Sequence, residues 1–214
     1  MKTIKNSNNK YSVRLILMTL LVITSLSCSK EECDYSNDCF EMNSINISTG
    51  IDTDGTSIST GNVDPLWVIA SSPYPSGTPA LSSSTYSVWE PSPVPSTNAN
   101  WINATGANCC TNLPGNYTFE RDFTISSGTA SFACNFGIAY DDSLIMLELV
   151  APDSSTIPLT VTPTSAYFLS TPITDVVYNP MVGTWKIRAT VNFFDVGAGF
   201  LTSGKIDIMQ PCSN

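Results

Sequence analysis

The chain from residue 43 onward is a succession of short runs rich in Val, Ile, Thr, Phe and Tyr, and this pattern limits its fold more than any other feature. Gly, Pro, Ser and Asn separate the runs, and no stretch of ordinary helix length has apolar residues at helical spacing. The clearest run, residues 117–125, places four apolar side chains on one side: Tyr117, Phe119, Phe123 and Ile125. Such alternation buries one face of a strand. We therefore predict an all-β domain.

Four further runs predict long strands, at 130–140, 144–150, 185–193 and 200–209. The run 144–150 is apolar on both faces, as in a central strand. Shorter candidates are 45–49, 66–70, 158–162 and 173–178. Roughly ten short strands must bury their apolar faces against each other, so we predict a two-sheet antiparallel β-sandwich.

The N-terminus has the features of an export signal. Four basic residues and no acidic one precede an apolar run of about a dozen residues, which is too short to span a bilayer. The run ends in Ser25-Leu26-Ser27-Cys28, and small residues before a cysteine fit a lipoprotein signal peptidase. We predict that residues 1–27 are cleaved and that Cys28 carries a lipid anchor. A single uncleaved membrane anchor is the alternative, which the short run disfavours.

The residues after Cys28 bear on location and charge. Residues 28–42 are polar and acidic and predict a tether for one domain, residues 43–214. Ser29-Lys30-Glu31-Glu32 resembles the acidic tag that sends some lipoproteins to the outer face of the outer membrane, so we expect surface exposure. Removing residues 1–27 takes four of nine Lys and Arg and none of eighteen Asp and Glu, leaving a net charge of −13. This charge argues against nucleic acid as a partner.

Seven cysteines become six once Cys28 is lipidated, and an even number in an oxidising compartment favours disulfides. The six are Cys33, Cys39, Cys109, Cys110, Cys134 and Cys212. The first two enclose a short acidic loop and are expected to pair locally. Cys109 and Cys110 are expected to form separate disulfides with Cys134 and Cys212. The sequence leaves open which of them pairs with which. The sequence has no His, so a Cys–His nucleophile is excluded and a zinc site is disfavoured.

Residues 71–100 are crowded with Pro and Ser and predict a long, ordered loop region. Two tryptophans and two amides in or beside it form our candidate ligand site: Trp89, Trp101, Asn100 and Asn103. An indole can stack on a sugar ring while amides bond its hydroxyls. Core packing is the alternative, and we place it slightly ahead even for these two indoles. Trp67 and Trp185 lie in strand-like runs and are expected to be structural.

Asp52, Asp54 and Asp64, with a turn at Gly55, are candidate oxygen ligands for a structural calcium ion. The segment lacks the later acid of a full EF-hand loop, so a solvated turn is the favoured interpretation. No other cofactor is expected.

Asp141 and Asp142 are two carboxylates, as a glycosidase needs. Adjacent strand residues point to opposite faces, however, so the two cannot easily flank one bond. A turn or ion pairing is expected there.

Arg121 falls on the otherwise apolar face of its strand, where a buried guanidinium needs a partner. The candidates are the two aspartates and Glu148. One alternative is a bulge that turns Arg121 outward. Another is that Arg121 binds a carboxylate or hydroxyl of a ligand.

Several pieces occur in an order that resembles bacterial secreted β-sandwich domains of the galactose-binding-like, jelly-roll type. They are Ser48-Thr49-Gly50-Ile51-Asp52, Asp64-Pro65-Leu66-Trp67, Trp101-Ile102, Gly115-Asn116-Tyr117-Thr118-Phe119 and Tyr140-Asp141-Asp142-Ser143. The resemblance covers nearly all of residues 43–214. It implies a jelly roll in which the Asp-Pro-x-Trp element opens a strand.

Together these features lead us to expect a non-catalytic, surface-tethered module that binds a glycan or another surface component. The alternative is a structural or assembly protein that binds other surface proteins, and burial of both loop tryptophans would favour it. A hydrolase would need two facing carboxylates, and the sequence offers no such pair.

Overall fold

The computed structural model describes residues 39–86, 89–91, 94, 97–107, 111–162, 167–170, 172–194 and 197–212. The expected signal peptide and Cys28, Cys33, Cys109 and Cys110 lie outside these residues. The described part is all-β and contains no helix, so it has none that could cross a membrane. Its strands are β1 (Phe40–Asn46), β2 (Val63–Ser71), β3 (Pro79–Ser83), β4 (Trp101–Asn103), β5 (Gly115–Ile125), β6 (Ser131–Asp141), β7 (Ser143–Val150), β8 (Thr156–Pro158), β9 (Val176–Tyr178), β10 (Gly183–Phe193) and β11 (Gly199–Pro211).

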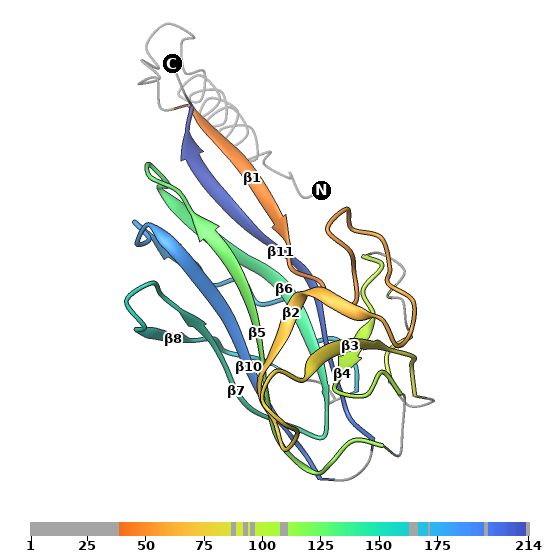
Figure 1. Ribbon diagram of the computed structural model, residues 1–214. Helices are drawn as coiled ribbons and strands as arrows, with labels where there is room; N and C mark the ends of the chain where they lie inside the picture. The colour runs from red at the N-terminus through yellow and green to blue at the C-terminus, as the bar shows by residue number, and fades with distance from the viewer. Residues whose placement is uncertain are drawn as a thin grey trace, which may run out of the picture. The chain divides into compact units, whose positions relative to one another are not determined.

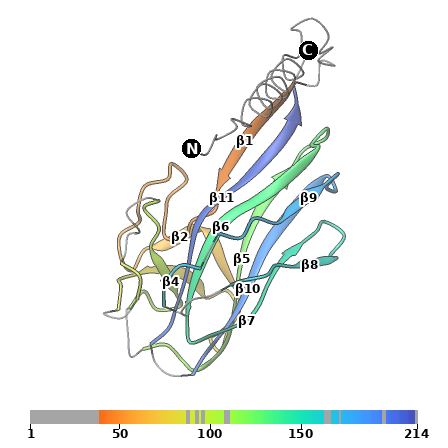
Figure 2. The same ribbon diagram turned by 180° about the vertical axis from the view of Figure 1, so that it is seen from behind.

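These antiparallel strands form one strongly curled sheet rather than two separate ones (Figures 1 and 2). The order is β8-β7-β10-β5-β2-β3-β4-β11-β6-β9, and β1 also pairs with β11. The short strands β3 and β4 carry the hydrogen bonding from β2 to β11, which is why the predicted pair of sheets is continuous. The all-β prediction is confirmed, while the separation into two sheets is not.

The core lies between the two halves of this curled sheet. Phe119 of β5 stacks on Phe200 of β11 with ring centroids 5.0 Å apart. Phe132 of β6 meets Phe123 of β5 at 5.4 Å and Trp185 of β10 at 5.1 Å. All of these rings are buried, so the alternating apolar residues of the long strands supply both walls of the core.

The five long strands occur where the sequence predicts them, as β5, β6, β7, β10 and β11. The sequence is less informative at the edges. The compact unit begins at Cys39 and β1 at Phe40, so the end of the predicted tether belongs to the sheet. β3 and β4 are absent from the prediction because their few residues lie in or beside the Ser- and Pro-rich segment.

A disulfide closes the paired ends of β1 and β11, which project past the end of β6 (Figure 1). It joins Cys39 to Cys212, so the expected local pairing of Cys39 with Cys33 is wrong.

Cys134 is a free, buried thiol on the core face of β6, and the expected bridge to it is also wrong. Burial raises the pKa of Cys134 to about 12, because the thiolate has no solvent there. It behaves as a small apolar core residue.

Candidate functional site

Trp89 and Trp101 are buried, with 4% and 0% of their surface exposed, so their faces are not available to a sugar ring. They stack on each other with centroids 4.4 Å apart. Together with Leu201 they form a second, smaller core on the outer face of β11 and β6. A β-carbon at Gly199 would lie 2.7 Å from Trp101 Cε3 and 3.0 Å from Trp89 Cη2, so the stack requires glycine there. Core packing, the competing prediction, is what the structure shows for both indoles.

The two amides of that predicted site are also structural. Asn103 is fully buried; its Nδ2 donates to the carbonyl oxygens of Ala107 at 2.6 Å and Ala198 at 2.9 Å. Asn100 is 8% exposed and donates to the Ile58 carbonyl at 2.9 Å. Each amide satisfies backbone groups of neighbouring loops, a common use of buried Asn. The four residues therefore hold loops to the sheet and do not form the predicted ligand site.

The three candidate calcium ligands do not converge, and the described residues contain no group of three carboxylate, thiol or imidazole side chains suited to a metal. Asp54 accepts hydrogen bonds from the Thr56 backbone and hydroxyl, as in a solvated turn, and these lower its pKa. Asp64 is buried and accepts from the backbone nitrogen of Gly50 at 2.6 Å and of Trp67 at 2.9 Å. Its burial outweighs these bonds and raises its pKa. Asp52 accepts from the adjacent Thr53.

Arg121 does face inward, but its partner differs from those predicted. It pairs in regular register with Trp67 and Ile187, so no bulge turns it outward. Its Nη2 donates to the Asn46 carbonyl at 3.2 Å, where the chain leaves β1. Burial lowers the pKa of Arg121, and the negative charge of Asp64 acts in the opposite direction. Arg121 therefore ties one half of the sheet to the other.

The carboxylates predicted to pair with Arg121 form other interactions. Glu148 accepts from Arg188 at 3.2 Å, and Arg188 also bonds Glu120 at 2.7 Å, in a row of charges on the outer face of β7, β10 and β5. Asp141 accepts from Trp89 Nε1 at 2.9 Å, and Asp142 accepts from a backbone nitrogen. These carboxylates hold strands and loops in place.

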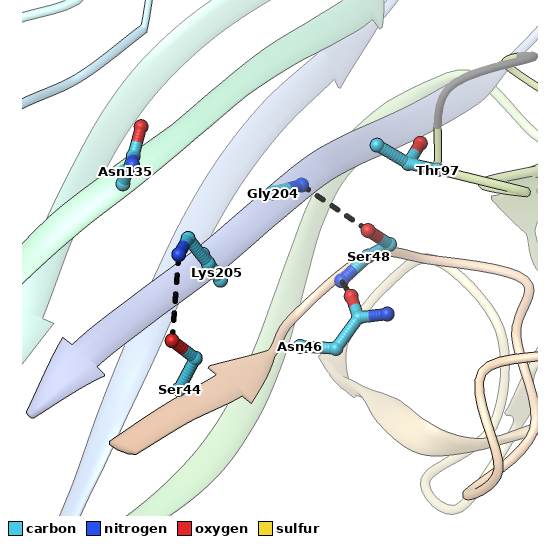
Figure 3. A pocket seen from close by; sticks show the side chains of 7 residues that line it. All are labelled: Ser44, Asn46, Ser48, Thr97, Asn135, Gly204 and Lys205. Atoms are coloured by element: carbon cyan, nitrogen blue, oxygen red, sulfur yellow. Dashed lines mark hydrogen bonds between the residues drawn. The ribbon is translucent and has the colours of Figure 1, made fainter. Parts of the chain in front are cut away.

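A groove lined by polar residues, which the sequence does not reveal and which we call the polar groove, lies on the outer face of the sheet (Figure 3). Carbon atoms of these residues supply most of its exposed surface. Its volume is about 410 Å³, within the range of small-molecule sites. Four separate segments line it: Ser44, Asn46 and Ser48 at and after the end of β1, Thr97 of the Pro-rich region, Asn135 of β6, and Gly204 and Lys205 of β11. The predicted loop thus contributes to a site, but through Thr97 and not through its indoles.

Two hydrogen bonds fix the shape of the polar groove. The Gly204 nitrogen donates to Ser48 Oγ at 3.1 Å, and the Ser48 nitrogen donates to Asn46 Oδ1 at 3.0 Å (Figure 3). Gly204 has a φ of +144°, and a β-carbon there would collide with the Asn135 carbonyl oxygen. Glycine is required at this position, where the segment after β1 runs beside β11 and the Ile47 nitrogen donates to the Gly204 carbonyl at 3.0 Å.

The charge on the groove floor is compensated. Lys205 Nζ lies 2.9 Å from Asp207 Oδ1 and 3.4 Å from Ser44 Oγ. Asn135 Nδ2 donates to Asp207 Oδ2 at 3.4 Å. Partial burial acts to raise the pKa of Asp207, but the hydrogen bonds from Ser44, Lys205 and Asn135 outweigh it and lower the pKa. The floor therefore offers hydroxyl, amide and paired ionic groups without a net charge.

The fold and this groove define an all-β domain with a neutral, hydrogen-bonding concavity on one sheet face. The sequence matches no family model, and no curated protein sequence is significantly similar to it.

Proposed function

We propose that this protein is a non-catalytic, surface-tethered binding module of the jelly-roll, galactose-binding-like type, and that its polar groove binds a glycan. The observation that carries the proposal is the groove itself, a concavity of about 410 Å³ lined by three hydroxyls, two amides and one lysine. Hydroxyl-rich ligands need many donors and acceptors at fixed positions, and this lining supplies both kinds.

The charge of the groove favours an uncharged sugar over an acidic one. Lys205 is the one cationic residue among the described lining residues, and Asp207 neutralises it at 2.9 Å. The net charge is −9 for the whole chain and −13 after the proposed cleavage, which adds long-range repulsion for anions.

A non-catalytic role agrees with the carboxylates around the groove. None of the described lining residues is acidic, and the adjacent Asp207 is committed to Lys205, Ser44 and Asn135. Glycoside hydrolysis generally needs two carboxylates on either side of the bond that breaks.

The proposed location follows from the N-terminal sequence. Cleavage after residue 27 and lipidation of Cys28 would anchor the chain, and the acidic residues that follow favour the outer surface of the outer membrane. A Cys28→Ala variant should then leave the membrane fraction in a bacterial host, with the unchanged chain as the control.

Glycan-array screening of the full chain, followed by calorimetry on the best ligand, tests the groove. Asn135→Ala removes an exposed amide from the floor and should weaken binding about 2- to 10-fold, as expected for one neutral hydrogen bond. Asn116→Ala makes the same chemical change on an exposed site of β5, outside the groove, and should leave affinity unchanged. Equal affinities for both variants would place the ligand elsewhere.

A structural or assembly role is the second candidate, and the burial of Trp89 and Trp101 favours it, because these two indoles then serve packing alone. Purification of the chain with stoichiometric protein partners, together with no glycan affinity, would support this role over the first.

A further inference from the structure

Five exposed apolar side chains gather on the outer face of the sheet, at the end closed by the disulfide. They are Phe40 and Met42 of β1, Met209 of β11, and Val176 and Tyr178 of β9, with exposed fractions of 49%, 66%, 42%, 44% and 75%. We call this surface the apolar tip. Exposed apolar groups that cluster in this way mark interaction surfaces in soluble domains.

The strand register shows that the apolar tip is one continuous surface. Met42 pairs with Met209, Met209 with Ser131, and Ser131 with Tyr178, so these side chains form one row across four strands. With neighbouring strands about 4.8 Å apart, the row is about 14 Å wide. Phe40 lies at the outer end, and the next row inward ends at Val176.

On the outer face, the two outermost rows of the apolar tip carry no charged side chain, although the exposed Glu41 and Asp175 adjoin tip residues in the chain. These rows hold only Phe, Pro, Met, Ser and Tyr. The first charged side chain on this face, Asp207, is paired with Lys205 at 2.9 Å. Such a surface loses little polar hydration on contact with an apolar medium.

The position of the apolar tip in the chain points to its partner. Phe40 follows Cys39, where the chain enters the domain, and the disulfide to Cys212 fixes that point. Eleven residue steps separate Cys39 from Cys28, which span at most about 40 Å when fully extended. If Cys28 carries the lipid, the anchor keeps the apolar tip within that distance of the bilayer.

We propose that the apolar tip binds the surface of the bilayer that holds the anchor. Met42, Met209 and Phe40 enter the interfacial region, and Tyr178 lies at the headgroups, where amphipathic aromatic rings are favoured. The inference rests on the lipid anchor of the proposed function. It brings the polar groove, which lies further along the same face, close to the membrane surface.

The test uses the full chain in vesicles of phosphatidylethanolamine and phosphatidylglycerol that contain brominated lipid. Tyr178→Trp places a reporter on the apolar tip, and Val68→Trp places one on the outer face of β2, where Val68 is 55% exposed. The four native tryptophans are at most 4% exposed and give a common background. We expect a blue shift and at least twofold stronger quenching for Tyr178→Trp. Equal quenching of the two reporters, or no recovery of the chain with the vesicles, overturns the proposal.

A second pair of variants separates membrane contact from other causes. Met42→Glu with Met209→Glu adds charge to the tip and should abolish the differential quenching of the Tyr178→Trp reporter, whereas Val68→Glu should leave it intact. A blue shift without lipid quenching, in a chain that sediments as a dimer, would assign the apolar tip to a second copy and overturn the proposal. Glycan affinity is measured on the same variants. If the differential quenching is absent but glycan affinity is retained, only the membrane contact is refuted. If the Asn135→Ala variant loses glycan affinity, that result concerns only the polar groove.

Discussion

Replacing both Cys39 and Cys212 by alanine removes the covalent closure of the β1–β11 end of the sheet. The two residues are 173 positions apart, so the bond closes nearly the whole domain into one loop. The chain-entropy relation gives about 5 kcal/mol for a loop of this length at 25 °C, because the restriction of the unfolded chain grows with the logarithm of loop length. For a domain of this size each kcal/mol corresponds to about 2–4 °C, so the melting temperature should fall by about 10–20 °C.

Thermal and guanidinium unfolding, followed by the fluorescence of the buried tryptophans, measure this loss. The unchanged protein in dithiothreitol should unfold with the midpoint of the double variant, and the double variant itself should not respond to the reductant. A double variant that melts within about 2 °C of the unchanged protein would refute the reasoning. So would an unchanged protein whose midpoint is the same with and without reductant.

Three further outcomes test other parts of the structure. Gly199→Ala places a methyl group 2.7 Å from Trp101 Cε3, so it should cost about 1–3 kcal/mol and change the near-ultraviolet circular dichroism; an unaltered spectrum and midpoint would contradict the packing. Burial acts to raise the pKa of Glu120, but hydrogen bonds from Lys186 and Arg188 outweigh it and hold the pKa below the usual 4.5. The ionised Glu120 therefore stabilises the fold above about pH 4.5, and that stability is lost as the pH falls through the lowered pKa. Glu120→Gln should show a smaller difference in unfolding free energy between pH 7 and pH 3, and an equal difference would argue against the ion pairs. Cys134 should resist alkylation at pH 8 in the native protein and react after unfolding, as peptide mass spectrometry can show; rapid native alkylation would contradict its burial.

The long strands are readable from the sequence because their information is local. In β5, Phe119 and Phe123 alternate with polar neighbours, and the pleat of a strand converts this directly into one buried face. The same argument places Trp185 in β10 and predicts its burial, at 3% exposure. Trp67 is also buried, as its strand-like surroundings indicate.

The candidate site could not be read in the same way, because pairing between distant segments creates it. Ser44 meets Asp207 and Asn46 faces Lys205 through the register of β1 against β11, more than 150 positions away in the chain. Arg121 shows the same limit: its position on the inner face is predictable, but its acceptor is a backbone carbonyl, at Asn46, and no residue type indicates that role. Disulfide partners are equally non-local, which explains why a nearby cysteine was the wrong partner for Cys39.

The bond between Cys39 and Cys212 also determines how the domain responds to mechanical force. A pull that arrives through the N-terminal segment reaches Cys39 and passes at once into the end of β11, the longest strand. Without the bond, β1 would separate from its neighbour one hydrogen-bonded pair at a time, starting at Phe40. With the bond, β1 and β11 are loaded together. The pull then acts along β11, whose pairs with β6 from Gly199 to Met209 resist it simultaneously.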